Sequence, residues 1–337
     1  MPSSRGTVTL ALLGDTMLGR GVAERLARGV PPESLVAPEI VELMASADLR
    51  LLNLECCISE RGERWPSPGK PFFFRAPPVA IALLRHLRID AVTLANNHAL
   101  DYGPEALSDT LGLLDAAGIV HVGAGGDLFG ARAPAIMDAG GLRLAIVGFA
   151  DHPADFAAAP DRPGIAHADL RRGLPPWVTD AVGSAAATAD LVLVTPHWGP
   201  NMRAEPLPAV RTAAEALVAA GASLVAGHSA HVFHGVGGRV LYDLGDFIDD
   251  YAIDPLLRND LGLLWLVTIE TGGPTRLEAI PLRLEYCHTR LARGEDAAWI
   301  RHRFTAACAG LGTLVRHDDG HLAIEWPQAS GESVPAR

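Results

Sequence analysis

Short apolar segments alternate along this chain with segments whose apolar residues recur every three or four positions. The short apolar runs cover 8–13, 47–55, 90–95, 142–149, 191–195 and 223–226. Helical periodicity covers 78–87, 104–117 and 209–220, and Gly118 and Gly221 follow the last two of these segments as helix stops. Strands that alternate with helices predict an α/β fold, and strands that are apolar throughout predict a sheet covered on both faces.

Strand-like patterns dominate the second half of the chain. They cover 239–244, 263–270 and 277–284, and they are followed by an amphipathic segment at 295–311 and a hairpin pattern at 315–326. We therefore expect one domain over residues 1–286 and a C-terminal extension over 287–337 that packs on it, with the last residues frayed. The segments 59–77 and 151–188 are rich in Pro, Gly or Ala and are predicted to be long functional loops.

Composition narrows the class of protein. The chain has 337 residues, of which 49% are hydrophobic, so it can bury a large core and is neither a disordered tail nor a disulfide miniprotein. A net charge of −11 argues against a nucleic-acid partner, because no surplus of basic residues is available to neutralise phosphates. No apolar run approaches the length of a membrane span or a signal-peptide core, so we expect a cytoplasmic protein without a membrane anchor.

Polar residues follow five of the apolar runs. They are Asp15, Glu55, the Asn96-Asn97-His98 segment, His197, and the pair His228 and His231. Ligands of α/β sheets bind at the carboxyl ends of the strands. Carboxylate, carboxamide and imidazole groups are ligands for Mn, Fe or Zn. The pattern therefore predicts a site for one or two divalent ions that activate water against a small anionic substrate.

Each of these residues also has an ordinary structural explanation. An Asp after a strand often caps the next helix, an Asn-Asn pair often forms a turn, and a lone His is commonly a hydrogen-bonded loop residue. The recurrence of such residues at five strand ends favours the metal site. The four cysteines contain no CxxC spacing, and Cys56 and Cys57 are adjacent, so neither a disulfide framework nor a thiolate zinc site is expected.

Six motifs in order carry a resemblance to a known family. They are GDTMLGR (14–20), NLE (53–55), LANNHALDYG (94–103), PHWG (196–199), GHSAHVFHG (227–235) and LYDLGDF (241–247). Over about residues 7–285 the chain resembles the CapA, or poly-γ-glutamate capsule-synthesis (PGA_cap), family, a branch of the calcineurin-like metallophosphoesterases. The resemblance implies a four-layer αββα sandwich of the metallo-dependent phosphatase type, with a metal centre at one sheet edge.

The same resemblance implies roles for individual residues. Metal ligands would be Asp15, Glu55, Asn97, His197, His228 and His231, and His98 would be the catalytic acid or oxyanion stabiliser. Departures from the superfamily are also visible. Met17 stands where a histidine is usual, Glu55 replaces the bridging aspartate, and the last two histidines are spaced by two residues rather than one. One metal position has therefore lost a strong ligand, and Asn96, Asp246 and His234 are further candidates at the site.

Several residues are candidates for binding the substrate. They are Arg20, Lys70, Arg75, Trp198 and Arg203, with the alternative that Arg75 forms a structural ion pair. Asp101 and Tyr102 are expected to orient His98 by hydrogen bonds.

The sequence is compatible with three functions and does not indicate the oligomeric state. The first is a metal-dependent hydrolase acting on a phosphate ester. The second is a poly-γ-glutamate or capsule biosynthesis protein acting on an amide or acyl-phosphate. The third is a non-catalytic, metal-stabilised binding protein.

Overall fold

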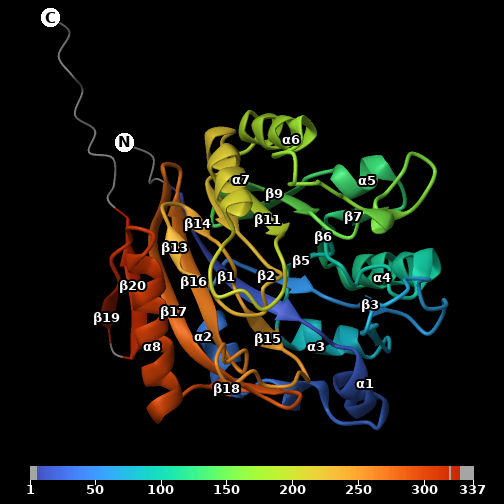
Figure 1. The fold of residues 1–337 in the computed structure, drawn as a ribbon, viewed down its shortest axis with the longest axis horizontal. Coiled ribbons are helices and arrows are strands. Elements are labelled where there is room, and N and C mark those ends of the chain that lie inside the picture. Colours follow the sequence, from blue (N-terminus) through green and yellow to red (C-terminus); the bar gives the residue numbers. More distant parts are fainter. Residues whose placement is uncertain (1–5, 319, 327–337) are drawn as a thin grey trace, which may run out of the picture.

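The computed structural model describes residues 6–318 and 320–326, and it contains two large β-sheets (Figure 1). The larger sheet has the strand order β19-β20-β17-β16-β1-β2-β5-β6, while β15 pairs with β1 and β18 with β17. Its strands are β1 (Thr7–Thr16), β2 (Leu49–Leu54), β5 (Ala91–Thr93), β6 (Val120–Val122), β15 (Asp246–Ile248), β16 (Leu261–Glu270), β17 (Gly273–Glu285), β18 (His288–Leu291), β19 (Arg316–Asp318) and β20 (His321–Glu325).

The smaller sheet has the order β13-β14-β12-β11-β9-β8. Its strands are β8 (Ala135–Ala139), β9 (Leu142–Ala150), β11 (Leu191–His197), β12 (Leu224–Ala226), β13 (Val236–Gly237) and β14 (Val240–Leu241). Two minor ladders pair β3 (Cys57–Ile58) with β4 (Arg75–Ala76) and β7 (Ala124–Gly125) with β10 (Gly164–Ile165). The parallel pairs β1–β2, β2–β5, β9–β11 and β11–β12 align the carboxyl ends of these strands within each sheet.

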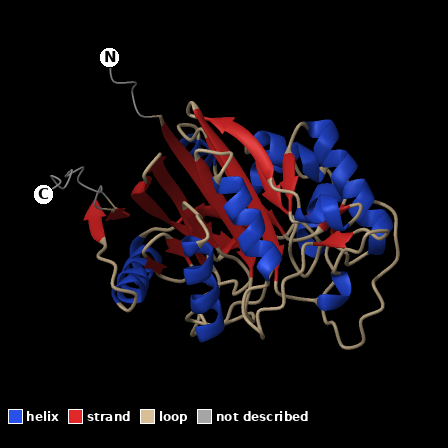
Figure 2. Ribbon diagram, turned by 90° about the horizontal axis from the view of Figure 1, so that it is seen from above, coloured by secondary structure: helices blue, strands red, loops and turns tan. Residues whose placement is uncertain are grey.

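Helices pack on both sheets, and most of them cover the outer faces (Figure 2). They are α1 (Arg20–Ala27), α2 (Pro38–Met44), α3 (Ala80–His86), α4 (Gly103–Ala117), α5 (Leu128–Arg132), α6 (Pro176–Ala186), α7 (Pro208–Ala219) and α8 (Gly294–Ala309), with 3₁₀ turns η1 (Pro32–Leu35) and η2 (Ala154–Phe156). The helices α1–α4 pack on the larger sheet, and α5–α7 pack on the smaller one. The helix α8 contributes Ile300 and Phe304 to the core between the sheets.

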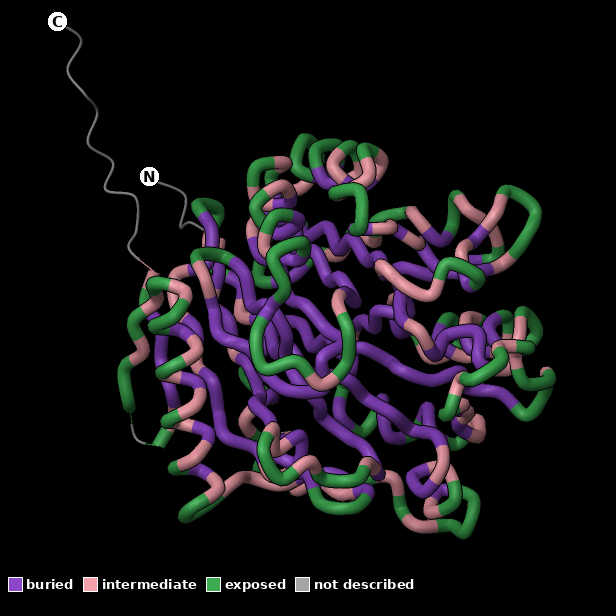
Figure 3. The backbone as a smooth tube through the Cα atoms, viewed as in Figure 1, coloured by how far each residue is buried: buried purple, intermediate pink, exposed green. Residues whose placement is uncertain are grey.

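Alternation along β1 shows how its sequence divides between two cores. Leu10 and Leu12 point into the core between the two sheets, whereas Ala11 and Leu13 belong to the core under α1–α4. Because successive strand residues point to opposite faces, an almost entirely apolar strand is needed where both faces are covered. The backbone tube is accordingly buried through the centre of the molecule, and most of its exposed turns lie at the periphery (Figure 3).

The α/β class, the predicted strands and the C-terminal hairpin are confirmed. The prediction of a long loop at 151–188 is wrong in part, because α6 occupies 176–186 and buries Val178, Val182 and Ala185. This helix had a sequence signal in Pro176, which occupies its first position. The domain boundary at 286/287 stays a prediction, and residues 328–337 lie outside the described part of the chain. In the described ranges, no helix combines the length and apolarity that crossing a membrane requires.

A close approach between β1 and β15 depends on Gly14. A Cβ atom at this position would lie 1.9 Å from the carbonyl oxygen of Gly245, so a side chain would push the two strands apart. We expect Gly14→Ala to lower the free energy of unfolding by at least about 1–3 kcal/mol, the usual cost of overpacking. Urea unfolding measures this change.

Gly112→Ala is the matched control for that experiment. A Cβ at Gly112, on the exposed side of α4, would meet no atom within 4 Å, and alanine favours a helix by about 1 kcal/mol over glycine. Equal stability of the two variants would contradict the close packing of β1 on β15.

Candidate metal centre

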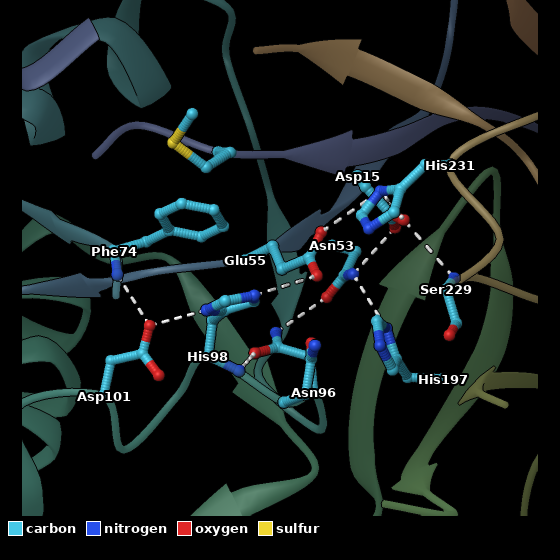
Figure 4. Close-up of polar contacts among 12 residues, drawn as sticks. Asp15, Asn53, Glu55, Phe74, Asn96, His98, Asp101, His197, Ser229 and His231 are labelled. Carbon is cyan, nitrogen blue, oxygen red and sulfur yellow. Dashed lines mark hydrogen bonds and ion pairs between the residues drawn. The ribbon is translucent and has the colours of Figure 1, made fainter. Parts of the chain in front are cut away.

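Residues from the ends of strands in both sheets converge on one buried site (Figure 4). Asp15 and Glu55 come from the ends of β1 and β2, His98 from the turn after β5, and His197 from the end of β11. His197 and His228 form an isolated parallel bridge, which continues the β11–β12 pairing into the site. The strand order therefore brings together residues that are distant in the chain, such as Asp15 and His228, which are 213 positions apart.

Asp15 lies at the centre of these contacts. Its Oδ1 accepts a hydrogen bond from Asn53 Nδ2 at 2.8 Å and lies 3.0 Å from His228 Nδ1. Its Oδ2 accepts a hydrogen bond from the backbone N–H of Ser229 at 3.3 Å and lies 3.3 Å from His231 Nδ1. Burial by itself would raise the pKa of Asp15, but the hydrogen bonds to His228 and His231 lower it well below its usual range. Asp15 is therefore held as a carboxylate.

Asp15, His231 and Asp246 form a compact group of potential metal ligands. Each of the three offers one ligand atom, and these atoms lie within 4.8 Å of one another. His231 Nδ1 is 2.8 Å from Asp246 Oδ1, and Asp246 pairs with Asp15 in the β1–β15 register. Ser229 and His231 have backbone φ values of 113° and 58°, a region that residues with a side chain rarely adopt. Such strain is characteristic of functional sites and aims His231 at the carboxylates.

Buried polar atoms without a partner surround this group. Among the described residues, atoms that lack a hydrogen-bond partner include both carboxylate oxygens of Glu55, Nε2 of His197 and His228, Oδ2 of Asp246 and Oδ1 of Asn97. Burial raises the pKa of Glu55 well above its usual value and lowers the pKa of His197 well below its usual value. Burying such groups unpaired is costly, and oxygen and imidazole donors match a divalent cation. The donor set therefore fits a metal ion.

His98 is held in one orientation by Asp101 and Phe74, which also contact each other. Its Nδ1 lies 2.5 Å from Asp101 Oδ2, and its ring stacks on Phe74 with 4.0 Å between the centroids. The same Asp101 oxygen accepts the backbone N–H of Phe74 at 2.6 Å. These contacts turn His98 Nε2 toward Glu55 Oε1, 3.9 Å away. Burial lowers the pKa of His98 to about 4 despite the opposing effect of Asp101, so the ring is neutral near pH 7.

Lys70 lies behind His98. Its ammonium group pairs with Asp101 and donates a hydrogen bond to the carbonyl of Asn97 at 2.6 Å. The Lys70 side chain is 15% exposed, and Asp101 is fully buried. The lysine thus supports the segment that carries His98, whereas the sequence suggested a substrate contact.

We expect Lys70→Met to destabilise the protein by about 3–5 kcal/mol, because it leaves the Asp101 carboxylate buried without its charged partner. Urea unfolding of the full chain measures the change. Lys70→Arg keeps the positive charge and is the matched control, so its loss of stability should be clearly smaller. A methionine variant as stable as the wild type would show that the ion pair contributes nothing.

The other predicted substrate contacts make contacts with the protein itself. Arg20 pairs with Asp250 at 2.8 Å. Arg75 donates hydrogen bonds to the carbonyls of Arg61 and Gly62, so its structural role is not the ion pair considered as an alternative. Trp198 is 3% exposed and packs in the core under α5–α7, and its indole N–H donates to the carbonyl of Tyr242.

Two further candidates stand at the margin of the site. His234 Nε2 lies 2.8 Å from the carbonyl oxygen of Arg203, so the histidine contacts the backbone of that residue, whose side chain is exposed. Asn96 belongs to the site's hydrogen-bond network: its Nδ2 donates to Asn53 Oδ1 at 2.9 Å, and its Oδ1 accepts the backbone N–H of His98 at 3.0 Å. The predicted substrate roles of five residues stay predictions: Arg20, Lys70, Arg75, Trp198 and Arg203.

Sequence reasoning missed Asn53 as a member of the site. Asn53 Nδ2 donates to Asp15 and also lies 3.3 Å from His197 Nδ1, so this amide links the ends of the two sheets. A signal was present, because Asn53 is a polar residue inside the fully buried strand β2. A buried amide in an apolar strand needs hydrogen-bond partners, and here they come from the site.

Comparisons with known proteins agree with one another. Residues 9–251 match the family model described as bacterial capsule synthesis protein PGA_cap. A probable polyglutamine synthesis accessory protein of Mycobacterium tuberculosis is 32% identical, with 90% of this chain and 91% of that protein covered. The capsule biosynthesis protein CapA of Bacillus anthracis is 27% identical (82% and 68% covered), and the PGA biosynthesis protein CapA of Bacillus subtilis is 28% identical (83% and 72% covered).

Proposed function

Because the chain belongs to the PGA_cap family of bacterial capsule synthesis proteins, and because its strand-end donors converge in one buried cluster, we propose that it is a metal-dependent hydrolase of a small anionic substrate, a phosphate ester. The observation that carries this proposal is the set of buried donor atoms without partners around Asp15, His231 and Asp246. A protein seldom leaves so many buried polar atoms unsatisfied without a ligand.

The residues that would hold the metal fall into two groups. Asp15, His231 and Asp246 form the carboxylate-rich group. We propose that Asn97, His197 and His228, whose buried donor atoms lack partners among the described residues, supply the ligands with more nitrogen, and that Glu55, 3.9 Å from His231, adds a carboxylate. When bound, one or two ions such as Mn, Fe or Zn would supply Lewis acidity and lower the pKa of a water molecule. Asp246 would replace the ligand lost at Met17.

His98 is the residue that would move a proton. Asp101 occupies Nδ1, so Nε2 is the atom left free to exchange a proton with the substrate. A neutral ring at this position takes a proton from the attacking water and returns it to the leaving oxygen. Phe74 and Asp101 fix the ring, and the low exposure of His98 and Glu55 keeps bulk water away from the transferred proton.

Attraction of an anionic substrate must be local, because the whole chain carries a net charge of −11. We propose that the metal and the side chains of Arg20 and Arg203 provide this attraction, and no nucleic acid is expected to bind.

We further propose that the two sheets with their outer helices form the αββα sandwich of metallo-dependent phosphatases over residues 1–286. Residues 287–337 would form an extension of this domain, and the protein would act in the cytoplasm.

A second function has a specific observation in its favour. The family is described by capsule synthesis, and the Mycobacterium tuberculosis relative by polyglutamine synthesis. The same metal cluster would then act on the amide or acyl-phosphate of a γ-glutamyl chain, whose carboxylates also need local positive charge. The two functions share the donor residues and differ in the bond that is broken or formed.

A substrate screen with the full chain separates them. The protein is supplied with Mn²⁺, Fe²⁺ or Zn²⁺ and tested on phosphomonoesters, phosphodiesters and γ-glutamyl peptides. Turnover of a phosphate ester supports the hydrolase, whereas turnover restricted to γ-glutamyl substrates supports the second function. Tight metal binding without any turnover would contradict both and leave a metal-stabilised binding protein.

A further inference from the structure

A cavity of about 500 Å³ lies between α8 and the segment that leads into α7. Trp299, His302 and Arg303 line it from α8, and Glu205 and Arg211 line it from the opposite side. Gly235 forms part of the wall, and a Cβ there would lie 2.5 Å from the backbone of Ala307. The cavity therefore has a closely packed wall at Gly235, and its lining includes no residue of the metal cluster.

The guanidinium group of Arg303 is unusual in this cavity. Its Nε and Nη2 atoms are buried, and neither has a hydrogen-bond partner within residues 6–318 and 320–326. The group lies 5.4 Å from the ring centroids of both Phe233 and Trp299. Stacking on two aromatic rings stabilises the cation in part, but the planar fork of donors still lacks an acceptor.

The charges that face Arg303 favour an added anion. Arg211 is a second cation of the lining, and Glu205 is the single carboxylate among the lining residues. Burial lowers the pKa of Arg303, and the nearby carboxylate of Glu205 offsets this effect only in part. The remaining lining includes the indole of Trp299 together with Pro206 and Leu311, which offer apolar contact. A guanidinium fork beside an apolar wall matches a carboxylate or phosphate group carried on an apolar body.

We propose that this cavity binds a small organic anion, with its carboxylate or phosphate group on Arg303 and Arg211 and its apolar body against Trp299. This site lies outside the proposed metal centre and does not depend on hydrolase activity. The anion satisfies the buried Nε and Nη2 donors of Arg303, which explains why these two atoms have no hydrogen-bond partner in the part of the chain that the structure describes.

Calorimetric titration of the full chain with benzoate, benzamide and inorganic phosphate tests the proposal. Benzamide has the shape of benzoate without its charge. We expect benzoate to bind with a Kd of about 1 mM or tighter and benzamide at least about tenfold more weakly. If phosphate also binds, and Arg303→Met weakens it as much as it weakens benzoate, the cavity recognises the anionic group and does not require the apolar body.

Arg303→Met is the decisive variant, because it keeps an unbranched side chain between Phe233 and Trp299. It should weaken benzoate and phosphate at least about tenfold, and without added anion its Tm should equal or exceed that of the wild type. Arg85→Met, at an exposed position of α3, is the matched control and should change neither value.

Any of three results would overturn the proposal. The first is that the wild type binds both benzoate and phosphate more weakly than a Kd of about 1 mM. The second is that Arg303→Met binds benzoate as tightly as the wild type, and the third is that the wild type binds benzamide as tightly as benzoate. If Arg303→Met does not fold, Arg211→Gln replaces it. Arg211 is half-buried at the other side of the cavity, and its loss should also weaken benzoate. Undiminished binding by Arg211→Gln would likewise count against the site.

Discussion

Asp15→Asn should reduce the affinity for divalent metal by about 100-fold or more, since even changes to residues behind metal ligands cost about 10–100-fold. Asparagine has nearly the same shape as aspartate but lacks the charge that faces His228 and His231. The variant should therefore fold while the metal site fails. Metal titration with Mn²⁺ or Zn²⁺ measures the affinity, and thermal unfolding without metal checks the fold.

Asp138→Asn is the matched control for that experiment. Asp138 is an exposed aspartate on β8, far in the fold from the strand ends that form the site. It should bind metal like the wild type. If Asp15→Asn bound metal as tightly as Asp138→Asn, Asp15 would not be a ligand, and the strand-end cluster would need another explanation.

His98→Gln is expected to lower kcat by about 10²–10⁴-fold on any substrate the protein turns over, the usual contribution of general acid–base catalysis. The metal content should stay at the wild-type level, because His98 Nδ1 is engaged by Asp101 and the proposed ligands surround Asp15 and Glu55. Steady-state kinetics and elemental analysis of the same sample separate a catalytic role from a ligand role.

His86→Gln provides the comparison, because His86 is an exposed histidine at the end of α3. Its turnover should match that of the wild type. A His98→Gln variant with wild-type kcat would remove the proton-transfer role of His98. A loss of both metal and turnover would instead assign His98 to the metal shell.

The sequence predicts the central strands of both sheets, because buried strands leave continuous apolar runs, but it does not predict the edge strands β6 and β8. β2 and β11 are buried along their whole length, and the polar residue that follows each run lies in the site. Parallel neighbours end at the same sheet edge, so residues such as Glu55 and His98 could be grouped before any contact was known. The family resemblance was carried by the same residues.

Other parts of the site depend on contacts that no local pattern specifies. Asp246 lies beside Asp15 because β15 pairs with β1, an approach that requires glycine at position 14. Lys70 is predicted to contact the substrate because it lies in the loop shortly after Glu55, and tertiary packing pairs it with Asp101, a contact that no local pattern indicates. The sequence does not predict helix α6, because its small, alanine-rich residues give a weak apolar pattern.

Metal content of the purified full chain tests the central claim most directly. Elemental analysis after supplementation with Mn, Fe and Zn, with Asp15→Asn prepared in parallel, should find at least one ion per chain in the wild type and almost none in the variant. Fewer than about one ion per three chains in the wild type, or equal content in the two proteins, would contradict a metal centre at Asp15, His231 and Asp246.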